Sequence, residues 1–126
     1  MTNEQSRHEE LIVGISKQMK GILDSSQQAV YIYLDDIHKV CNGKYASLLG
    51  YRSPEEWAKD ENLMEATVER SSQETLVTAY NQVMEKFIPA NVKVTWKKKS
   101  GGTVATFVVL APIAYNDHIF ALHFVS

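Results

Sequence analysis

The sequence contains one cysteine, little net charge and no long hydrophobic run. Cys41 stands alone among 126 residues, so no disulfide can form within the chain, as is typical of proteins from reducing compartments. No Cys-x-x-Cys pair or Cys/His cluster indicates zinc, and we predict no metal site. The polar N-terminus lacks the apolar core of a signal peptide, and no apolar run approaches the roughly 20 residues that cross a bilayer. We therefore expect a cytoplasmic protein without a membrane partner.

A net charge of −2 gives the chain no strong field that would attract nucleic acid. The charge is unevenly distributed: residues 1–85 carry 8 Lys and Arg against 14 Asp and Glu, whereas residues 86–126 carry 5 Lys and 1 Asp. Three of these lysines, at 97–99, directly precede Ser100-Gly101-Gly102. Because charge runs usually lie on solvated faces, we favour an exposed hairpin tip over a nucleic-acid-binding patch.

Motifs that mark common active sites are also missing. There is no Gly-x-Ser-x-Gly, His-Glu-x-x-His, phosphate-binding loop or dinucleotide-binding glycine motif. Asp35 and Asp36 are adjacent, so their side chains should point apart in a turn rather than form a catalytic pair. We interpret the scattered histidines as exposed or hydrogen-bonded, and Cys41 as a buried apolar residue; the histidines are His8, His38, His118 and His123. We predict no catalytic residue and no enzymatic activity.

Helical periodicity is clear in several segments. Residues 5–23 place an apolar stripe on one side of a helix, which must cover the chain's own sheet or the same helix in a second chain. Ser53-Pro54-Glu55-Glu56 and Ser71-Ser72-Gln73-Glu74 each predict a helix start with a capping box. The helix after Ser71 should end before Pro89, and a shorter helix is expected over 44–49.

The hydrophobic period changes from 3.6 to 2 after Pro89. Val92, Val94 and Trp96 alternate with polar residues, which predicts a half-buried strand. Further strands are predicted over 29–34, 38–41, 103–111 and 118–125. The first and the last two of these are apolar on both faces, whereas a sheet with one face in water alternates. We therefore predict one α+β domain whose sheet is covered by internal helices on one face and by the N-terminal helix or a partner subunit on the other.

Two stretches resemble the PAS domain family. Asn42-Gly43-Lys44-Tyr45-Ala46-Ser47-Leu48-Leu49-Gly50-Tyr51, followed by Ser53-Pro54-Glu55-Glu56-Trp57, is similar to the family's Asn…LeuLeuGlyTyr…GluGlu segment. Lys98-Lys99-Ser100-Gly101-Gly102, followed by Pro112-Ile113, looks like the hairpin and strand that end a PAS sheet. Ile22-Leu23-Asp24-Ser25-Ser26 resembles the usual entry to the first strand, so the likeness covers about residues 20–126.

The resemblance implies a PAS-like five-stranded antiparallel sheet with helices on one face, formed by residues 24–126, and an N-terminal flanking amphipathic helix over residues 1–23. Many family members bind a small molecule between sheet and helices, and many pair through the outer sheet face or a flanking helix. Flavin-cysteinyl photochemistry is not supported, because residues 53–60 contain no cysteine. Haem ligation by a helix histidine is not supported either, because no histidine lies between His38 and His118. The identity of any cofactor is left open.

The alternation along the strand after Pro89 places Val92, Val94 and Trp96 on one face. We extend this alternation to the other strands through the resemblance and so assign side chains to the two faces of the sheet. Candidates for a ligand pocket on the helix-covered face are Ile32, Leu34, Asn42, Trp57, Leu76, Tyr80, Val83, Val94, Trp96, Thr106, Val108, Leu110, Leu122 and Phe124. Candidates for dimer contacts on the outer face or N-terminal helix are Leu11, Ile15, Met19, Tyr31, Tyr33, Phe107, Val109 and His123. Asn42 is expected to tie two backbone segments together rather than to react.

These features predict a sensory, signal-transducing domain that binds a small ligand in its core, forms a homodimer, or does both. A ligand-free interaction module is the alternative. A small α+β enzyme is a third hypothesis, which would need a buried Asp or His facing a cavity, and the predicted inward residues include none. No output domain is evident, and Phe124-Val125-Ser126 ends the chain where family members usually continue into a linker. We expect the sensor part of a larger signalling protein, such as a histidine kinase, or a domain that acts on a partner in trans.

Overall fold

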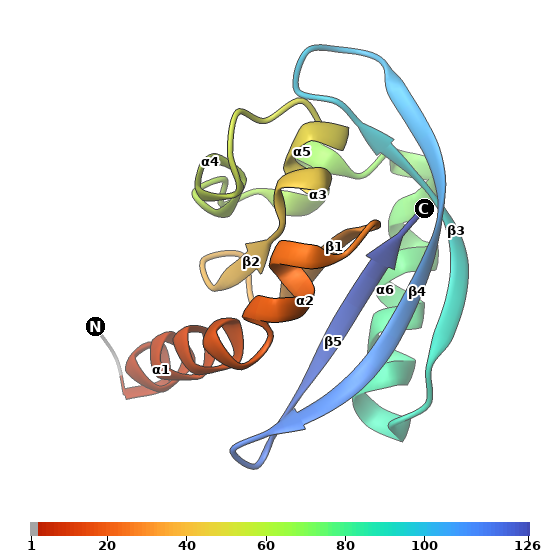
Figure 1. Ribbon diagram of the computed structural model, residues 1–126. Coiled ribbons are helices and arrows are strands. Elements are labelled where there is room, and N and C mark those ends of the chain that lie inside the picture. Colours follow the sequence, from red (N-terminus) through yellow and green to blue (C-terminus); the bar gives the residue numbers. More distant parts are fainter. Residues whose placement is uncertain (1–2) are drawn as a thin grey trace.

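Five strands form one antiparallel sheet in the computed structural model, which describes residues 3–126 (Figure 1). The strands are β1 (Ala29–Tyr33), β2 (Lys39–Cys41), β3 (Ala90–Lys97), β4 (Thr103–Tyr115) and β5 (His118–Val125). Their order across the sheet is β2-β1-β5-β4-β3, which places the last strand of the chain in the centre, between β1 and β4. The predicted α+β class and five-stranded antiparallel sheet are confirmed.

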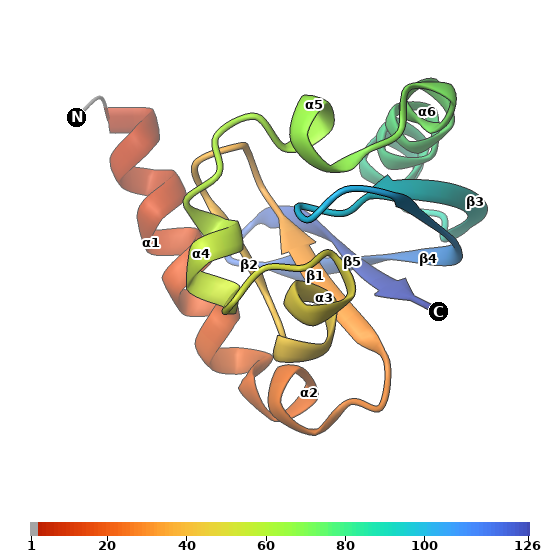
Figure 2. The same ribbon diagram turned by 90° about the horizontal axis from the view of Figure 1, so that it is seen from above.

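Six helices accompany the sheet in the described part of the chain: α1 (Asn3–Gln18), α2 (Lys20–Ser25), α3 (Gly43–Leu48), α4 (Pro54–Ala58), α5 (Leu63–Thr67) and α6 (Arg70–Lys86). The single helix predicted over 5–23 is divided at Met19, and α5 was not predicted. In Figure 2, α1 and α6 lie on opposite sides of β1 and β5. None of the described helices combines the length and the apolar character that a membrane span requires.

The two predicted helix starts had different outcomes. Ser53 caps α4 as expected, because its hydroxyl accepts the backbone N–H of Glu56 at 3.1 Å and Pro54 occupies the first helical position. The capping box at Ser71 was wrong, since the N-cap of α6 is Glu69, two residues earlier, and the carboxylate of Glu69 accepts the Ser71 N–H at 3.0 Å. A carboxylate at this position also meets the positive end of the helix dipole.

Strand β4 continues past Pro112 to Tyr115, four residues beyond the predicted end. The pairing of β4 with β3 stops at Leu110, opposite Ala90, whereas its pairing with β5 continues to Tyr115. Pro112 therefore lies where β4 has a neighbour on one side only, and a residue without an N–H is tolerated there.

Each face of the sheet carries its own buried core, and strand residues alternate between the two. The inner core, under α3 to α6, includes Tyr31, Trp57, Trp96, Val108 and Leu110. The outer core, under α1 and α2, comprises Leu11, Ile12, Ile15, Met19, Leu23, Val30, Ile32, Phe120 and Leu122. The inference that both faces are covered is confirmed over β1 and β5, and the chain's own N-terminal helices provide the outer cover.

The predicted faces of β1 and β5 were reversed. Tyr31, Tyr33 and His123, assigned to the outer face, lie on the inner one. Ile32, Leu34, Leu122 and Phe124, assigned to the inner face, pack in the outer core. A strand that is buried on both sides shows no polar alternation, so its parity cannot be read from its own residues.

The faces of β3 and β4 were correctly predicted, because polar residues alternate with apolar ones in β3. Val94, Trp96, Thr106, Val108 and Leu110 are buried on the inner side. Phe107 and Val109 point outward, beyond the cover of α1, and keep 55% and 41% of their surface exposed.

The assignment of Leu11, Ile15 and Met19 to a dimer contact was wrong in this arrangement, because all three are buried against the sheet of their own chain. Gly14 allows this close packing. A Cβ atom at position 14 would come within 2.1 Å of the Tyr115 hydroxyl, so a larger residue would require the end of the Tyr115 side chain to move.

Candidate ligand pocket

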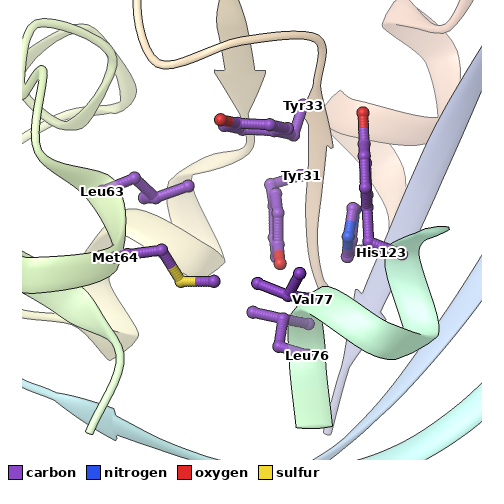
Figure 3. Close-up of a pocket in the computed structure, with 8 residues that line it drawn as sticks. Tyr31, Tyr33, Leu63, Met64, Leu76, Val77 and His123 are labelled. Carbon is purple, nitrogen blue, oxygen red and sulfur yellow. The ribbon is translucent and has the colours of Figure 1, made fainter. Parts of the chain in front are cut away.

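A pocket of about 240 Å³ lies between the inner face of the sheet and the helices α5 and α6 (Figure 3). Its walls come from β1, β5, α5 and α6, and its lining residues are Tyr31, Tyr33, Leu63, Met64, Leu76, Val77, Tyr80 and His123. Figure 3 shows Leu63 and Met64 facing Tyr31 from the α5 side. The pocket is an apolar space with aromatic walls, the usual character of small-molecule sites.

Three parallel rings form one wall of the pocket. The imidazole of His123 stacks on Tyr31, with ring centroids 3.9 Å apart and planes 12° apart. Tyr80 lies parallel to the same imidazole at 6.2 Å, and Tyr33 meets Tyr80 edge-on at 5.6 Å. The register explains the main contact, because Tyr31 and His123 are paired across the β1–β5 ladder. Rings held in this way are a rigid surface against which a planar ligand can pack.

His123 is the polar group of this wall, and it is almost fully buried. Burial lowers its pKa to about 3, and the nearby backbone of Tyr31 and Ala121 offsets this only in part. The imidazole is therefore neutral at pH 7, with one donor and one acceptor nitrogen. Its Nδ1 is buried and has no hydrogen-bond partner in the described part of the chain. A buried nitrogen without a partner costs stability, and a ligand atom can supply the missing hydrogen bond.

The tyrosine hydroxyls of the pocket are also neutral at pH 7. Burial raises the pKa of Tyr80 to about 12, and burial with neighbouring tyrosines raises the pKa of Tyr31 well above its usual value. The pKa of Tyr33 is raised by burial and by its hydrogen bond to Asp36, at 2.8 Å. Since no lining residue carries a charge, the pocket suits an uncharged ligand.

Two further polar atoms behind the wall have no partner in the described chain: the hydroxyl of Tyr45 and Nε1 of Trp57. Tyr45 stacks on Tyr31 at 4.6 Å, and Trp57 meets Tyr45 edge-on at 5.3 Å. The inner core thus contains three unpaired polar atoms, counting His123 Nδ1. Native cores pair nearly all such groups, and each buried polar atom without a partner costs stability.

The loop that leads into α5 is anchored by the buried Lys39. Its ammonium group donates to the backbone carbonyls of Asp36, Ala58 and Asp60 at 2.5, 3.0 and 2.6 Å, and it lies over the ring of Trp57. Burial lowers the pKa of Lys39, and nearby carboxylates oppose that shift. This anchor holds the segment that carries Leu63 and Met64 into the pocket wall.

Of the residues predicted for a pocket, the structure places Leu76 and Tyr80 in its lining. Trp57, Val83, Val94, Trp96, Val108 and Leu110 pack in the inner core without lining it. Thr106 accepts the indole N–H of Trp96 at 2.8 Å. Asn42 ties backbone segments together as expected, because its Oδ1 accepts from Val30 and Tyr45 and its amide donates to the Gln28 carbonyl.

The remaining lining residues were missed for two reasons. Tyr31, Tyr33 and His123 were placed on the other face of the sheet. Knowing which residues of β2 and β4 they pair with would have assigned them to the correct face. Leu63 and Met64 were not considered, since α5 has five residues and too little periodicity to predict. Val77 belongs to the predicted helix that forms α6, but it was not assigned to the pocket. Cys41 is buried, and burial raises the pKa of its thiol to about 12, which fits the predicted unreactive role.

No protein-family model matches the chain, and no curated protein sequence is significantly similar to it. Solved structures are similar in fold. A PAS domain from Colwellia psychrerythraea is 18% identical, with a TM-score of 0.68, over 89% of this chain and 95% of that one. The PAS domain of nitrogen regulation protein NR(II) from Vibrio parahaemolyticus is 17% identical, with a TM-score of 0.64, over 84% and 94%.

A structure of VqmA bound to DPO is 12% identical, with a TM-score of 0.66, over 87% of this chain and 56% of that one. At these identities the similarity establishes the fold and nothing finer. The predicted PAS-like fold is confirmed.

Proposed function

We propose that this chain is a sensory domain that binds a small, uncharged, largely apolar molecule in the pocket between β1, β5, α5 and α6. The observation that carries the proposal is His123, a neutral buried imidazole that lines the pocket and whose Nδ1 has no partner in the described chain. A compact aromatic or heteroaromatic ring with one hydrogen-bonding atom matches this pocket, because it can stack on the parallel rings and pair with Nδ1.

A signal needs a route from the pocket to the surface, and β1 offers one. Tyr31 faces the pocket, while its neighbour Ile32 packs in the outer core with Ile15 of α1. A ligand that favours one position of Tyr31 and His123 therefore also favours one packing of α1 on β1 and β5. Ligand binding changes the output only through such a difference in affinity for two arrangements.

Ligand screening tests the proposal. We expect single-ring aromatic and heteroaromatic compounds to raise the melting temperature, and titration calorimetry to measure their affinity. Val77→Phe, at the half-open rim, should weaken binding at least tenfold because the larger side chain fills the pocket. Thr78→Phe is the matched control, since Thr78 is the next residue of α6, is exposed, and does not line this pocket.

The sensor proposal fails if no compound shifts the melting temperature and the purified protein retains no ligand mass in native mass spectrometry. It also fails if Val77→Phe and Thr78→Phe bind equally well. Either result favours the interaction module that the sequence also suggested.

The interaction module has one specific observation in its favour. Phe107 and Val109 are exposed side by side on the outer face of β4, where α1 does not cover the sheet. A second copy of the chain could bury them. Sedimentation should then show a monomer–dimer equilibrium that Phe107→Glu removes, and a strictly monomeric wild type contradicts this role.

The enzyme hypothesis required a buried Asp or His facing a cavity, and His123 now satisfies that condition. An imidazole whose pKa is about 3 is a weak base at neutral pH, however. No carboxylate, thiol or lysine lines the pocket with it. The pocket therefore favours binding over catalysis.

A further inference from the structure

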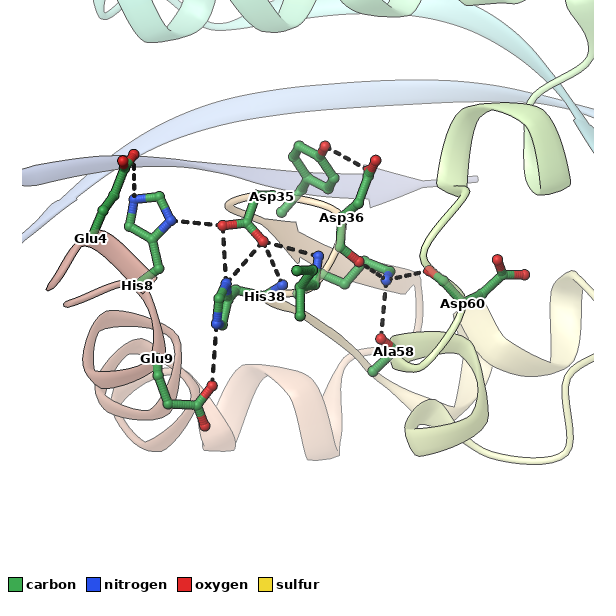
Figure 4. Close-up of polar contacts among 11 residues, drawn as sticks. Glu4, His8, Glu9, Asp35, Asp36, His38, Ala58 and Asp60 are labelled. Carbon is green, nitrogen blue, oxygen red and sulfur yellow. Dashed lines mark hydrogen bonds and ion pairs between the residues drawn. The ribbon is translucent and has the colours of Figure 1, made fainter. Parts of the chain in front are cut away.

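A histidine of α1 meets an aspartate and a second histidine of the turn between β1 and β2, where α1 crosses that turn (Figure 4). This histidine cluster consists of His8 on α1, and Asp35 and His38 in the turn. One nitrogen or oxygen atom from each of the three lies within 4.8 Å of the others. The four histidines were predicted to be exposed or hydrogen-bonded, without a metal site, and the fold brings two of them to one carboxylate.

Both imidazoles present the same nitrogen to Asp35. His8 Nδ1 is 2.6 Å from Oδ2 of Asp35, and His38 Nδ1 is 3.0 Å from the same oxygen and 2.9 Å from Oδ1. Oδ1 also accepts the backbone N–H groups of Ile37 and His38, at 2.9 and 2.7 Å. The turn therefore fixes the carboxylate, and Oδ2 is the oxygen shared by the two rings.

The opposite nitrogen of each ring faces another carboxylate. His38 Nε2 is 3.3 Å from Glu9, and His8 Nε2 is 3.9 Å from Glu4. When a metal ion takes the Nδ1 lone pair of each ring, the proton of the imidazole is on Nε2, where an outer carboxylate can accept it. Metal-binding histidines are oriented in this way by outer carboxylates. Without a metal ion, the Nδ1–H groups of the two rings can instead donate to Asp35, at the observed separations of 2.6 to 3.0 Å.

We propose that His8 Nδ1, His38 Nδ1 and Asp35 Oδ2 bind a divalent transition-metal ion of the zinc type. Two imidazoles and a carboxylate form a familiar ligand set for zinc, with water at the remaining position. Ligand atoms around tetrahedral zinc are about 3.3 Å apart, so the observed 2.6 and 3.0 Å separations need to widen by less than 1 Å. The exposed part of α1 can supply this adjustment.

A fourth donor atom, again a histidine nitrogen, lies next to the cluster. The ring of His118 contacts that of His8 edge-on, with centroids 6.2 Å apart, and its Nε2 is buried without a hydrogen-bond partner in the described chain. The site would join three elements: α1, the turn after β1, and the start of β5 beside it. A bound ion would therefore fix the position of α1 on the sheet.

Calorimetric titration of the whole chain with zinc chloride, after removal of metal by chelation, tests this site. We expect one ion per chain, and cobalt(II) in place of zinc should give the visible absorption of a four-coordinate site. Asp35→Asn and His8→Gln should abolish measurable binding. Asp35→Asn retains the oxygen that accepts the Ile37 and His38 N–H groups, so the turn should persist.

Two further variants complete the experiment. Glu9→Gln should weaken zinc binding about tenfold, because it changes the group that orients His38. Glu85→Gln, an exposed residue of α6, is the control and should bind like the wild type. Hydrogen exchange supplies an independent readout, since zinc should slow exchange in α1 and EDTA should reverse the effect.

The proposal is overturned if the wild type binds neither zinc nor cobalt(II), or if Asp35→Asn and His8→Gln, folded by circular dichroism, bind as the wild type does. An unchanged exchange rate in α1 on zinc addition also contradicts it, because the ligands come from both α1 and the turn.

Discussion

The two faces of the sheet are both buried, but they differ in chemistry. The outer core between α1 and the strands is made of Leu, Ile, Val, Met and Phe side chains, which have no polar atoms to satisfy. The inner core contains stacked tyrosines, tryptophans and a histidine, and three of their polar atoms have no partner in the described chain. Packing in the outer core stabilises the fold, whereas the unpaired polar atoms near the pocket reduce the stability that the inner core provides. Substitutions on the two faces should therefore have different effects.

The largest effect is expected in the outer core. Ile15→Ala should lower the free energy of unfolding by roughly 3 kcal/mol, because Ile15 is fully buried and its truncation leaves a cavity. Urea denaturation measures the change. Val13→Ala, on the exposed side of α1, is the matched control and should change stability by about 0.5 kcal/mol or less. Equal losses in both variants would mean that α1 does not pack as described.

The pH dependence of stability should depend on the inner face. The pKa of His123 is about 3 when folded, against a usual value of 6.5, so the unfolded chain binds the proton more readily. The stability that comes from keeping His123 neutral is then fully present above pH 6.5. As the pH decreases toward 3, the free energy of unfolding falls by up to about 1.4 kcal/mol per pH unit.

Urea denaturation at pH 7, 6 and 5 in wild type and His123→Phe isolates this contribution. His118, whose pKa is lowered by burial, His8 and Arg7, acts in the same direction in both proteins. The slope should be much smaller in His123→Phe, and equal slopes would show that His123 does not lose its proton on folding.

The same variant distinguishes stability from binding at pH 7. His123→Phe keeps a flat ring on Tyr31 but removes the unpaired Nδ1, so unfolding should become harder by about 1 kcal/mol. Affinity for any ligand found by screening should fall about tenfold in titration calorimetry. If His123→Phe binds the ligand as well as the wild type does, Nδ1 takes no part in binding and the pocket acts as a purely apolar site.

The smallest effect is expected where the outer face is uncovered. Phe107 is exposed and contacts the Lys93 ammonium at 5.6 Å from the ring centre. Phe107→Ser should change the free energy of unfolding by about 0.5 kcal/mol or less in thermal or urea denaturation. A loss several times larger would show that this part of the sheet is covered in solution.

The sequence predicts some of this architecture well and some of it poorly, for physical reasons. Strand β3 alternates polar and apolar residues, so Val94 and Trp96 were assigned correctly, and the strand predicted over 118–125 has the same bounds as β5. Strands β1 and β5 are buried on both sides, so Tyr31 and His123 were assigned to the wrong face and the pocket was only partly found.

The histidine cluster is another feature that the sequence did not predict. His8 and Asp35 are 27 positions apart in different elements, and only the packing of α1 across the β1–β2 turn brings them together. By contrast, Asp35 and Asp36 point apart as predicted, one toward the histidines and the other toward Tyr33. Local geometry follows from adjacent residues, whereas a site shared between distant elements depends on the tertiary fold.

The proline in the middle of β4 has a consequence for how copies of this protein can meet. Beyond Leu110 the strand has β5 on one side and no strand on the other, which leaves backbone groups that another chain could pair with. Pro112 interrupts that row because it has no N–H to offer, and strand-to-strand growth into extended aggregates is disfavoured at this edge. The contact between copies proposed for Phe107 would then use side chains on the sheet face rather than this edge.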